Sequence, residues 1–253
     1  MGANAKKIIL NIAYPLIVLA AVIAIWWIGA AVIGVSLILP TPAEAVREFF
    51  AYLADGSFWR AVGNSMWHSV YAFLISFAFA LVFAVASKLW RPFRRLMGPL
   101  VSIIRAVPTM SVIFILILLL DSKRAPAAVA IIVIFPTLYS SFMATVDGID
   151  EKLVQMCKVY QIGLGSRLKK LYLPNMAPGI LEGCASGFSL NIKLVIAAEV
   201  MAHTVRSLGN LMYNANWMLE TQKLFALTIA AVILSVLCEW IIRLIGRAVV
   251  RWK

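Results

Sequence analysis

The chain has 253 residues, of which 63% are hydrophobic and only 13% are charged, and its formal net charge is +12. A soluble domain carries about 25% charged residues, so the composition excludes an ordinary water-soluble protein and indicates a chain whose main solvent is lipid. The positive charge does not indicate a nucleic-acid-binding protein, because the basic residues cluster at the ends of apolar spans, as the positive-inside rule expects.

Six apolar segments are each long enough to cross about 30 Å of hydrocarbon as an α-helix. Only helices or closed barrels satisfy their backbone groups in lipid, and no alternating pattern of about ten residues indicates a barrel. The sequence predicts an all-α membrane protein, with one membrane domain over residues 1–253. Its six transmembrane helices are expected near Ile8–Ile33, Ala61–Ser87, Leu96–Leu120, Pro126–Val146, Pro178–Met201 and Leu224–Ile245.

The first span follows Lys6 and Lys7, as a signal peptide would. A signal peptide has an apolar region of about 7–15 residues, and this run is longer, at about 26 residues. The segment is therefore predicted to be an anchor that stays in the mature protein.

The distribution of basic residues predicts the orientation. With the N-terminus inside, the cytoplasmic segments hold fifteen of the 23 Lys and Arg residues, whereas the external segments hold six basic and five acidic residues. This asymmetry predicts an N-in, C-in topology. The segment between the fourth and fifth spans, residues 150–174, then faces the cytoplasm.

Prolines interrupt two of the spans. Arg105 and Pro108 lie within the third span, and Pro136 lies within the fourth. Proline removes a backbone hydrogen bond and kinks a helix, so both helices are expected to bend. Kinked helices around a central pathway are common in transporters, although many kinks serve only packing.

The cytoplasmic segment 150–174 is basic and amphipathic, has a turn at Ile162–Ser166, and ends in a Leu173-Pro174 stop. A connection between two membrane helices does not need this length. We therefore interpret the segment as a binding element for a cytoplasmic partner.

The fifth span carries small and polar residues on two of its faces. One row, with a spacing of four, runs from Gly179 to His203 and contains two overlapping GxxxG units, which permit close helix approach in a membrane. The other row consists of Glu182, Ser186, Ser189 and Lys193. Such a helix is expected to be buried in a bundle, and its polar sides fit either plain helix packing or a solute pathway.

Ionisable groups inside the bilayer need a partner. Lys193 is too far along the helix from Glu182 to pair with it, at about 16 Å, so it requires a partner from another helix, a water-filled cavity or an anionic substrate. Glu239 in the last span is assigned a structural role. Glu199 and His203, four residues apart near the outer end, are interpreted as a gate or an external contact rather than a metal site.

Motifs for catalysis are missing from the sequence. It has no GxxxxGK[ST] motif for ATP and no spacing typical of a serine hydrolase or a zinc protease. Cys157, Cys184 and Cys238 have no CxxC spacing, so neither a disulfide nor a zinc site is predicted. The sequence therefore predicts a non-enzymatic chain that holds no cofactor or metal of its own.

The cytoplasmic segment resembles the EAA loop of the permease subunits of type I ABC importers. In that family a Glu-Ala-Ala run, a Gly six residues after the Glu and a final Leu-Pro define a coupling helix that docks into the ATPase subunit. Counting back from Leu173-Pro174, the Glu-Ala-Ala positions fall on Gln155, Met156 and Cys157, and the Gly position falls on Gln161. Gly163 and Gly165 are expected to supply the turn instead.

Other segments are similar to the nitrate, sulfonate and taurine importer permeases, and together they extend the resemblance over residues 39–253. They are Leu39-Pro40-Thr41-Pro42 with Glu44, Arg105 to Pro108, Phe135-Pro136 through Asp150, Ala198-Glu199-Val200-Met201 and Ser207-Leu208-Gly209.

The resemblance implies a homodimer in a bacterial-type inner membrane, two ATPase subunits that bind ATP and Mg, and an extracytoplasmic binding protein that delivers the solute. The residues it assigns to ATPase coupling are Asp150, Glu151, Lys152, Gln155, Met156, Cys157, Tyr160, Gln161, Gly163 and Gly165. Those assigned to the translocation pathway or gate are Arg105, Pro108, Gly187, Asn191, Lys193, Glu199 and His203.

Two other functions stay open at this point. An ion-coupled secondary transporter or channel needs coupled titrating groups or a pore ring, and no inverted repeat is visible. A membrane scaffold predicts no solute flux. For an importer, the expected solute is a small anion such as a sulfonate, taurine or nitrate, with a vitamin precursor or another small organic solute as the alternative.

Overall fold

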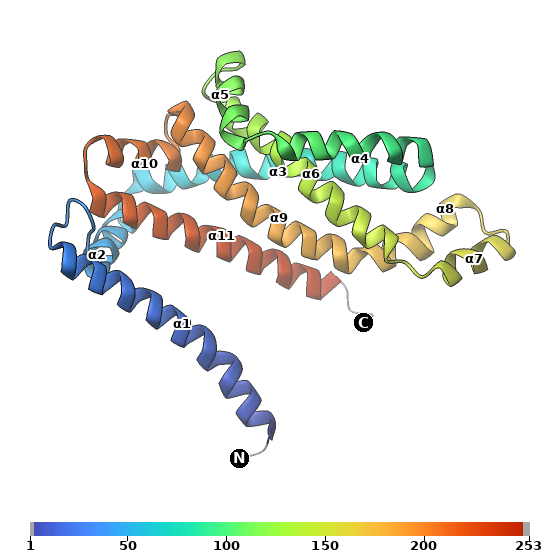
Figure 1. Ribbon diagram of the computed structural model, residues 1–253, viewed down its shortest axis with the longest axis horizontal. Helices are drawn as coiled ribbons and strands as arrows, with labels where there is room; N and C mark the ends of the chain where they lie inside the picture. Colours follow the sequence, from blue (N-terminus) through green and yellow to red (C-terminus); the bar gives the residue numbers. More distant parts are fainter. Residues whose placement is uncertain (1–2, 250–253) are drawn as a thin grey trace. The chain divides into compact units, whose positions relative to one another are not determined.

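The computed structural model (Figure 1) describes residues 3–249, and within that range the side chains of all but residues 3–12, Lys158, Leu164, Leu168 and Val249. All the regular structure in this range is helical, as the composition predicts. The α-helices are α1 (Ala3–Ile33), α2 (Pro42–Leu53), α3 (Gly56–Leu89), α4 (Arg91–Ala106), α5 (Thr109–Leu119), α6 (Ala125–Asp147), α7 (Glu151–Val159), α8 (Leu164–Arg167), α9 (Leu173–Ala202), α10 (Leu208–Trp217) and α11 (Thr221–Val249). A π-helical turn, Leu168–Tyr172, precedes α9.

Among the described residues, helices long and apolar enough to span a membrane occur at five of the six predicted spans. Five helices, α1, α3, α6, α9 and α11, are long and apolar enough by themselves. The third predicted span is not a single helix: it is divided into α4 and α5, which are bent by 89° at the break. Pro108 occupies the N-cap position of α5, and it lacks the N–H that would continue α4, so the predicted interruption is confirmed and is sharper than a kink.

The described chain divides into two compact units, so the single domain over residues 1–253 stays a prediction. One unit holds the residues up to Trp59 with Leu211–Ala230, and the other holds Arg60–Asn210 with the residues from Ala231 onward.

In the first unit, α1 exposes almost all of its described apolar side chains, as expected for a helix in contact with lipid. Its C-terminal half is held by Trp26, whose ring stacks on Phe225 with centroids 5.3 Å apart and whose Nε1–H donates to Pro40 O at 2.9 Å. The next helix, α2, begins with a capping box formed by Thr41 and Glu44, which satisfies the first free N–H groups of the helix.

In the second unit, α6 and α9 form the central antiparallel pair (Figure 1). A Cβ added at Gly179 would lie 2.5 Å from Thr145 Oγ1, and one at Gly183 would lie 2.4 Å from Ser141 Oγ. These glycines therefore permit the close helix approach that their GxxxG spacing predicts.

The cytoplasmic segment of the prediction is a short helix followed by a long extension of α9. The chain is helical almost without a break from Leu164 through the π-helical turn into α9. The Leu173-Pro174 pair therefore begins α9 and does not stop the segment, which corrects the prediction. Proline is compatible with this place because the first turn of a helix does not need its N–H groups.

A small apolar core joins α7 to the ends of α6 and α9. Its buried members include Val146, Ile149, Cys157 and Met176. The inner face of α7 is thereby fixed to the membrane bundle, while its other face is exposed.

Candidate translocation and coupling sites

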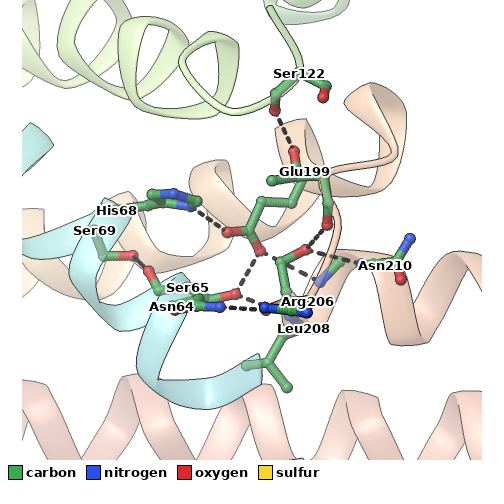
Figure 2. Close-up of polar contacts among 12 residues, drawn as sticks. Asn64, Ser65, His68, Ser69, Ser122, Glu199, Arg206, Leu208 and Asn210 are labelled. Carbon is green, nitrogen blue, oxygen red and sulfur yellow. Dashed lines mark hydrogen bonds and ion pairs between the residues drawn. The ribbon is translucent and has the colours of Figure 1, made fainter. Parts of the chain in front are cut away.

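Glu199, in the last turn of α9, is fully buried and lies at the centre of a polar cluster (Figure 2). One carboxylate oxygen accepts a hydrogen bond from Ser65 Oγ at 2.6 Å and one from the Gly209 N–H at 3.3 Å. The other oxygen lies 2.8 Å from His68 Nδ1. A buried carboxylate is stable only when such partners replace its hydration, so this cluster joins α3, α9 and the start of α10.

The loop after α9 closes around the same carboxylate. His203 ends the helix in the left-handed conformation, with φ 49°, and its N–H donates to the carbonyls of Glu199 and Val200. A Cβ at Gly209 would lie 2.4 Å from Glu199 Cβ, so only glycine permits this approach of α10 to α9. Ser65 also accepts the N–H of Leu208 at 2.9 Å, which fixes the first turn of α10.

Two residues that the sequence places on the pathway are instead packed inside the second unit. A Cβ at Gly187 would lie 2.8 Å from Leu138 Cδ2 and 3.5 Å from Phe73 Cε2, so Gly187 serves helix packing. Asn191 is fully buried, and its Nδ2 donates to Ser69 O at 2.8 Å. Its Oδ1 has no hydrogen-bond partner among the described residues.

The exposed side of α9 is formed by other residues than the packed Gly187 and Asn191. Its members have a spacing of three or four residues and lie on one helix face, and they are Glu182, Ser186, Leu190, Lys193 and Ala197. We call this set the α9 stripe. It contains three members of the second polar row predicted from the sequence, and Ser189 of that row is buried.

The two basic residues predicted within the bilayer have different surroundings. Lys193 is exposed on the α9 stripe, and no ion pair involves it within the described part of the chain. Arg105 is exposed in the last turn of α4, two residues before the break at Val107-Pro108, and its Nη2 donates to Pro136 O at 3.1 Å. This contact holds the end of α4 on α6.

Arg243 of α11 is the partner of two acidic residues, one on α9 and one on α11. It forms an ion pair with Glu182, and its Nη2 lies 2.9 Å from Glu239 Oε1. The structural role predicted for Glu239 agrees with this geometry.

The coupling segment presents two faces of α7. Asp150 Oδ1 accepts the Lys152 N–H at 2.8 Å and so caps the helix, and Glu151, Lys152 and Gln155 are exposed to solvent. Cys157, at the second Ala position of the family motif, is buried in the core beneath α7. The outward face carries exposed apolar side chains from Leu153, Met156, Val159 and Tyr160.

Gln161 has a positive φ of 51° in the turn that follows α7. This is the position at which the resembling family has its glycine, the residue best suited to the left-handed region. Gly163 and Gly165 do not have a positive φ, although both are exposed. The expectation that they replace the family glycine is therefore wrong: Gln161 makes the turn at the original position, with backbone strain.

Several residues of these sites were missed by sequence reasoning. His68 and Ser65 had no motif that paired them with Glu199, and Arg243 had none that paired it with Glu182. The one available signal was that each is a polar residue inside an apolar span, which calls for a partner without identifying it.

Comparison with known proteins identifies the family of this chain. The family model of the binding-protein-dependent transport system inner membrane component matches residues 76–251. The chain is 24% identical over 237 residues to the putative aliphatic sulfonates transport permease protein SsuC of Bacillus subtilis (strain 168), covering 92% of this chain and 85% of the relative. It is 22% identical over 241 residues to the taurine transport system permease protein TauC of Escherichia coli (strain K12), covering 92% and 87%.

A solved structure shares the fold. An inward-facing conformation of the MetNI methionine ABC transporter superposes with a TM-score of 0.63 at 15% identity, covering 76% of this chain and 94% of that chain. Since the family match extends over most of the sequence, this chain belongs to the binding-protein-dependent transport system inner membrane component family and is a multi-pass, inner-membrane permease subunit of an ABC importer.

Proposed function

We propose that two copies of this chain form the membrane pathway of an importer for a small anion such as a sulfonate, taurine or nitrate. An extracytoplasmic binding protein delivers the anion. Two partner ATPase subunits, which bind ATP and Mg, dock on α7 from the cytoplasm, where the charge distribution places it with both chain termini. ATP binding and hydrolysis in those subunits move α7 and thereby open and close the pathway.

The observation that carries this proposal is the outward face of α7. Four apolar side chains, Leu153, Met156, Val159 and Tyr160, are exposed on a segment that the charge distribution places outside the lipid. A contiguous exposed apolar surface in water indicates a site of protein contact. The buried Cys157 on the other side of the helix connects a partner on that face directly to the ends of α6 and α9.

The α9 stripe supports a pathway between two copies. A single chain leaves Lys193 and Ser186 exposed on a membrane-spanning helix, where lipid contact with a charged group costs several kcal/mol. A second copy facing this stripe removes the charge from lipid and lets it line a water-filled passage. The translocation pathway is therefore assigned to the stripe rather than to Gly187 and Asn191.

The anionic solute is supported by Lys193 and by the relatives. An ammonium group with no acidic partner in the described chain attracts an anion in a low-dielectric passage. Arg105 donates from one nitrogen to Pro136 O, and no other hydrogen bond of its guanidinium, which has five N–H donors, is found among the described residues. The names of two relatives specify aliphatic sulfonates and taurine.

The first experiment is to tag the chain, solubilise it gently from its native membrane and identify the co-purifying proteins by mass spectrometry. An ATPase subunit at about a 1:1 ratio is the expected result for one docking site per chain. Its absence in several mild detergents would contradict the docking role of α7 and favour an ion-coupled carrier, which transports in vesicles without ATP.

The solute is tested with the purified complex in proteoliposomes. We expect ATP-dependent uptake of labelled taurine, methanesulfonate or nitrate, and we expect Lys193→Ala to lower it by about tenfold while Lys193→Arg retains it. Arg247→Ala, at an exposed basic residue near the C-terminal end of α11, is the control. Unchanged uptake in a folded Lys193→Ala complex would remove Lys193 from the pathway.

A further inference from the structure

Asp147, the last residue of α6, is the acceptor of an ion cluster outside the sites described above. Its two carboxylate oxygens accept hydrogen bonds from Arg94 Nη1 at 3.0 Å and Nη2 at 2.6 Å. Lys88 Nζ, at the end of α3, lies 3.6 Å from Oδ1. The cluster joins the ends of α3 and α6 to the start of α4, on the side that the charge distribution assigns to the cytoplasm.

The geometry of this cluster favours positioning over stability. Arg94 and Asp147 are exposed, with relative exposures of 48% and 38%, and Lys88 is partly exposed, at 28%. Exposed ion pairs contribute little to the stability of the fold. A bidentate Arg–carboxylate pair nevertheless fixes the relative orientation of the two groups, because two parallel N–H···O bonds must be kept together.

A second arginine holds the other end of α4. Arg105 donates to Pro136 O on α6. Arg105 lies eleven positions after Arg94, and Asp147 lies eleven positions after Pro136. The equal spacing places α4 and α6 in antiparallel register over about 16 Å, with one arginine contact at each end. The two contacts make α4 follow α6, up to the break at Pro108.

Asp147 lies close enough to α7 to connect the movement of α7 to α4. Only Gly148, Ile149 and Asp150 separate Asp147 from α7, and Ile149 is buried in the same core as Cys157. A displacement of α7 therefore reaches the end of α6 through a packed core. From there, the Arg94–Asp147 pair is the polar contact that extends to α4.

We propose that Asp147 is a positioning residue that transmits the movement of α7 to α4 through Arg94, so that the α4–α5 break follows the nucleotide state of the partner ATPase. This inference rests on the proposed ATPase docking at α7. It predicts that loss of the Arg94–Asp147 pair uncouples the movement of α4 from ATP hydrolysis, while the ATPase still docks on α7.

The test uses the complete complex, with its co-purified ATPase, in nanodiscs. Cys157 is buried and is kept, Cys184 and Cys238 are replaced by alanine, and a spin label is attached at Ser102→Cys, an exposed position of α4. The distance between the labels of the two copies is measured by electron–electron double resonance with and without ADP–vanadate. ATP hydrolysis is measured in parallel.

We expect the parent complex to shift this distance on trapping, and Asp147→Asn to lower the shift by at least about half while hydrolysis and ATPase retention persist. Arg95→Gln, an exposed neighbour with no ion pair among the described residues, should behave as the parent. The charge exchange Asp147→Arg with Arg94→Asp should restore the shift.

A normal shift in Asp147→Asn, or no recovery in the exchanged pair, would overturn the inference alone, because docking and hydrolysis would still be observed. A parent complex that retains no ATPase would overturn the proposed function as well.

Discussion

The two ends of α9 are built in opposite ways. At its C-terminal end, Glu199 is fully buried, and both of its oxygens have partners on α3 and at the start of α10. At its N-terminal end, the helix extends into a segment where Met156 and Tyr160 are exposed and Gln161 has a left-handed backbone. One end satisfies its polar groups internally, and the other leaves apolar groups for a partner to cover.

This difference distinguishes the end of α9 that stabilises the helix bundle from the end that is available to a partner protein. Buried polar networks with all their bonds made are rigid, because breaking any one bond leaves a group unsatisfied. Exposed apolar faces contribute little to the fold of the chain itself and are available to a second protein. Changes at the Glu199 end should therefore alter stability, and changes at the α7 end should alter assembly.

The largest expected effect is that of Glu199→Ala. It leaves Ser65 and the Gly209 N–H without their acceptor in a buried site, at a cost of about 3 kcal/mol or more. We expect the thermal unfolding midpoint of the detergent-solubilised chain, followed by tryptophan fluorescence, to fall by about 10 °C. Glu182→Ala, which removes an exposed carboxylate, is the control, and equal midpoints for the two variants would show that the buried cluster does not stabilise the bundle.

Gly209→Ala tests the close approach at the same end of α9. A Cβ there would meet Glu199 Cβ at 2.4 Å and Val200 N at 2.6 Å, so the backbone must shift. We expect a loss of about 1–3 kcal/mol, measured as a lower unfolding midpoint. Gly165→Ala is the matched variant, because a Cβ at Gly165 has nothing within 4 Å and should leave the midpoint unchanged. A fall of the same size in both would argue against a packing cause.

Met156→Glu tests the other end. It places a charge on the exposed apolar face of α7, and a desolvated charge without a partner weakens an interface by about 2 kcal/mol or more. We expect at least about tenfold less ATPase to co-purify, at an unchanged unfolding midpoint of the free chain. Ala248→Glu adds the same charge at an exposed position near the C-terminal end of α11 and should retain the ATPase. Normal retention in Met156→Glu would place the docking surface elsewhere.

Gln161→Gly is expected to have the smallest effect and a favourable one. Glycine removes a left-handed strain of about 1 kcal/mol at φ 51°, partly offset by its greater freedom in the unfolded chain. Amide hydrogen exchange across Tyr160–Gly163 should slow slightly, whereas Gln161→Val, with a β-branched side chain, should accelerate it. Faster exchange in the glycine variant would mean that the turn does not need a left-handed residue.

The sequence predicted the features that depend on one segment at a time. Apolar runs gave the spans, and Pro108 gave the interruption of the third. The GxxxG spacing gave the close approach of α9 to another helix, since close packing requires small residues wherever the partner lies. The segment 150–174 was recognised as an interaction element because its length and charge exceed what a connection needs.

The predictions from sequence were wrong or missing where a residue's role depended on which helix faces pack against each other. Gly187 and Lys193 both belong to polar or small rows of one helix, and only the position of α6 shows that the first is packed and the second exposed. Glu199 required a partner, but His68 and Ser65 are more than a hundred residues away in the chain. The Gly position of the coupling motif fell on Gln161, and a sequence pattern does not report a backbone dihedral angle.

By itself, then, the sequence determined that this is a helical membrane protein, because a helix satisfies its own backbone hydrogen bonds in lipid. Of the six spans that it predicted, five are single helices in the described chain, and the third is the bent pair α4 and α5. The tertiary structure decided which polar residues lock the bundle and which remain for a solute or a partner. The physical reason is that a polar group in lipid must find a partner, and only the register between helices decides whether that partner is another side chain of the same chain.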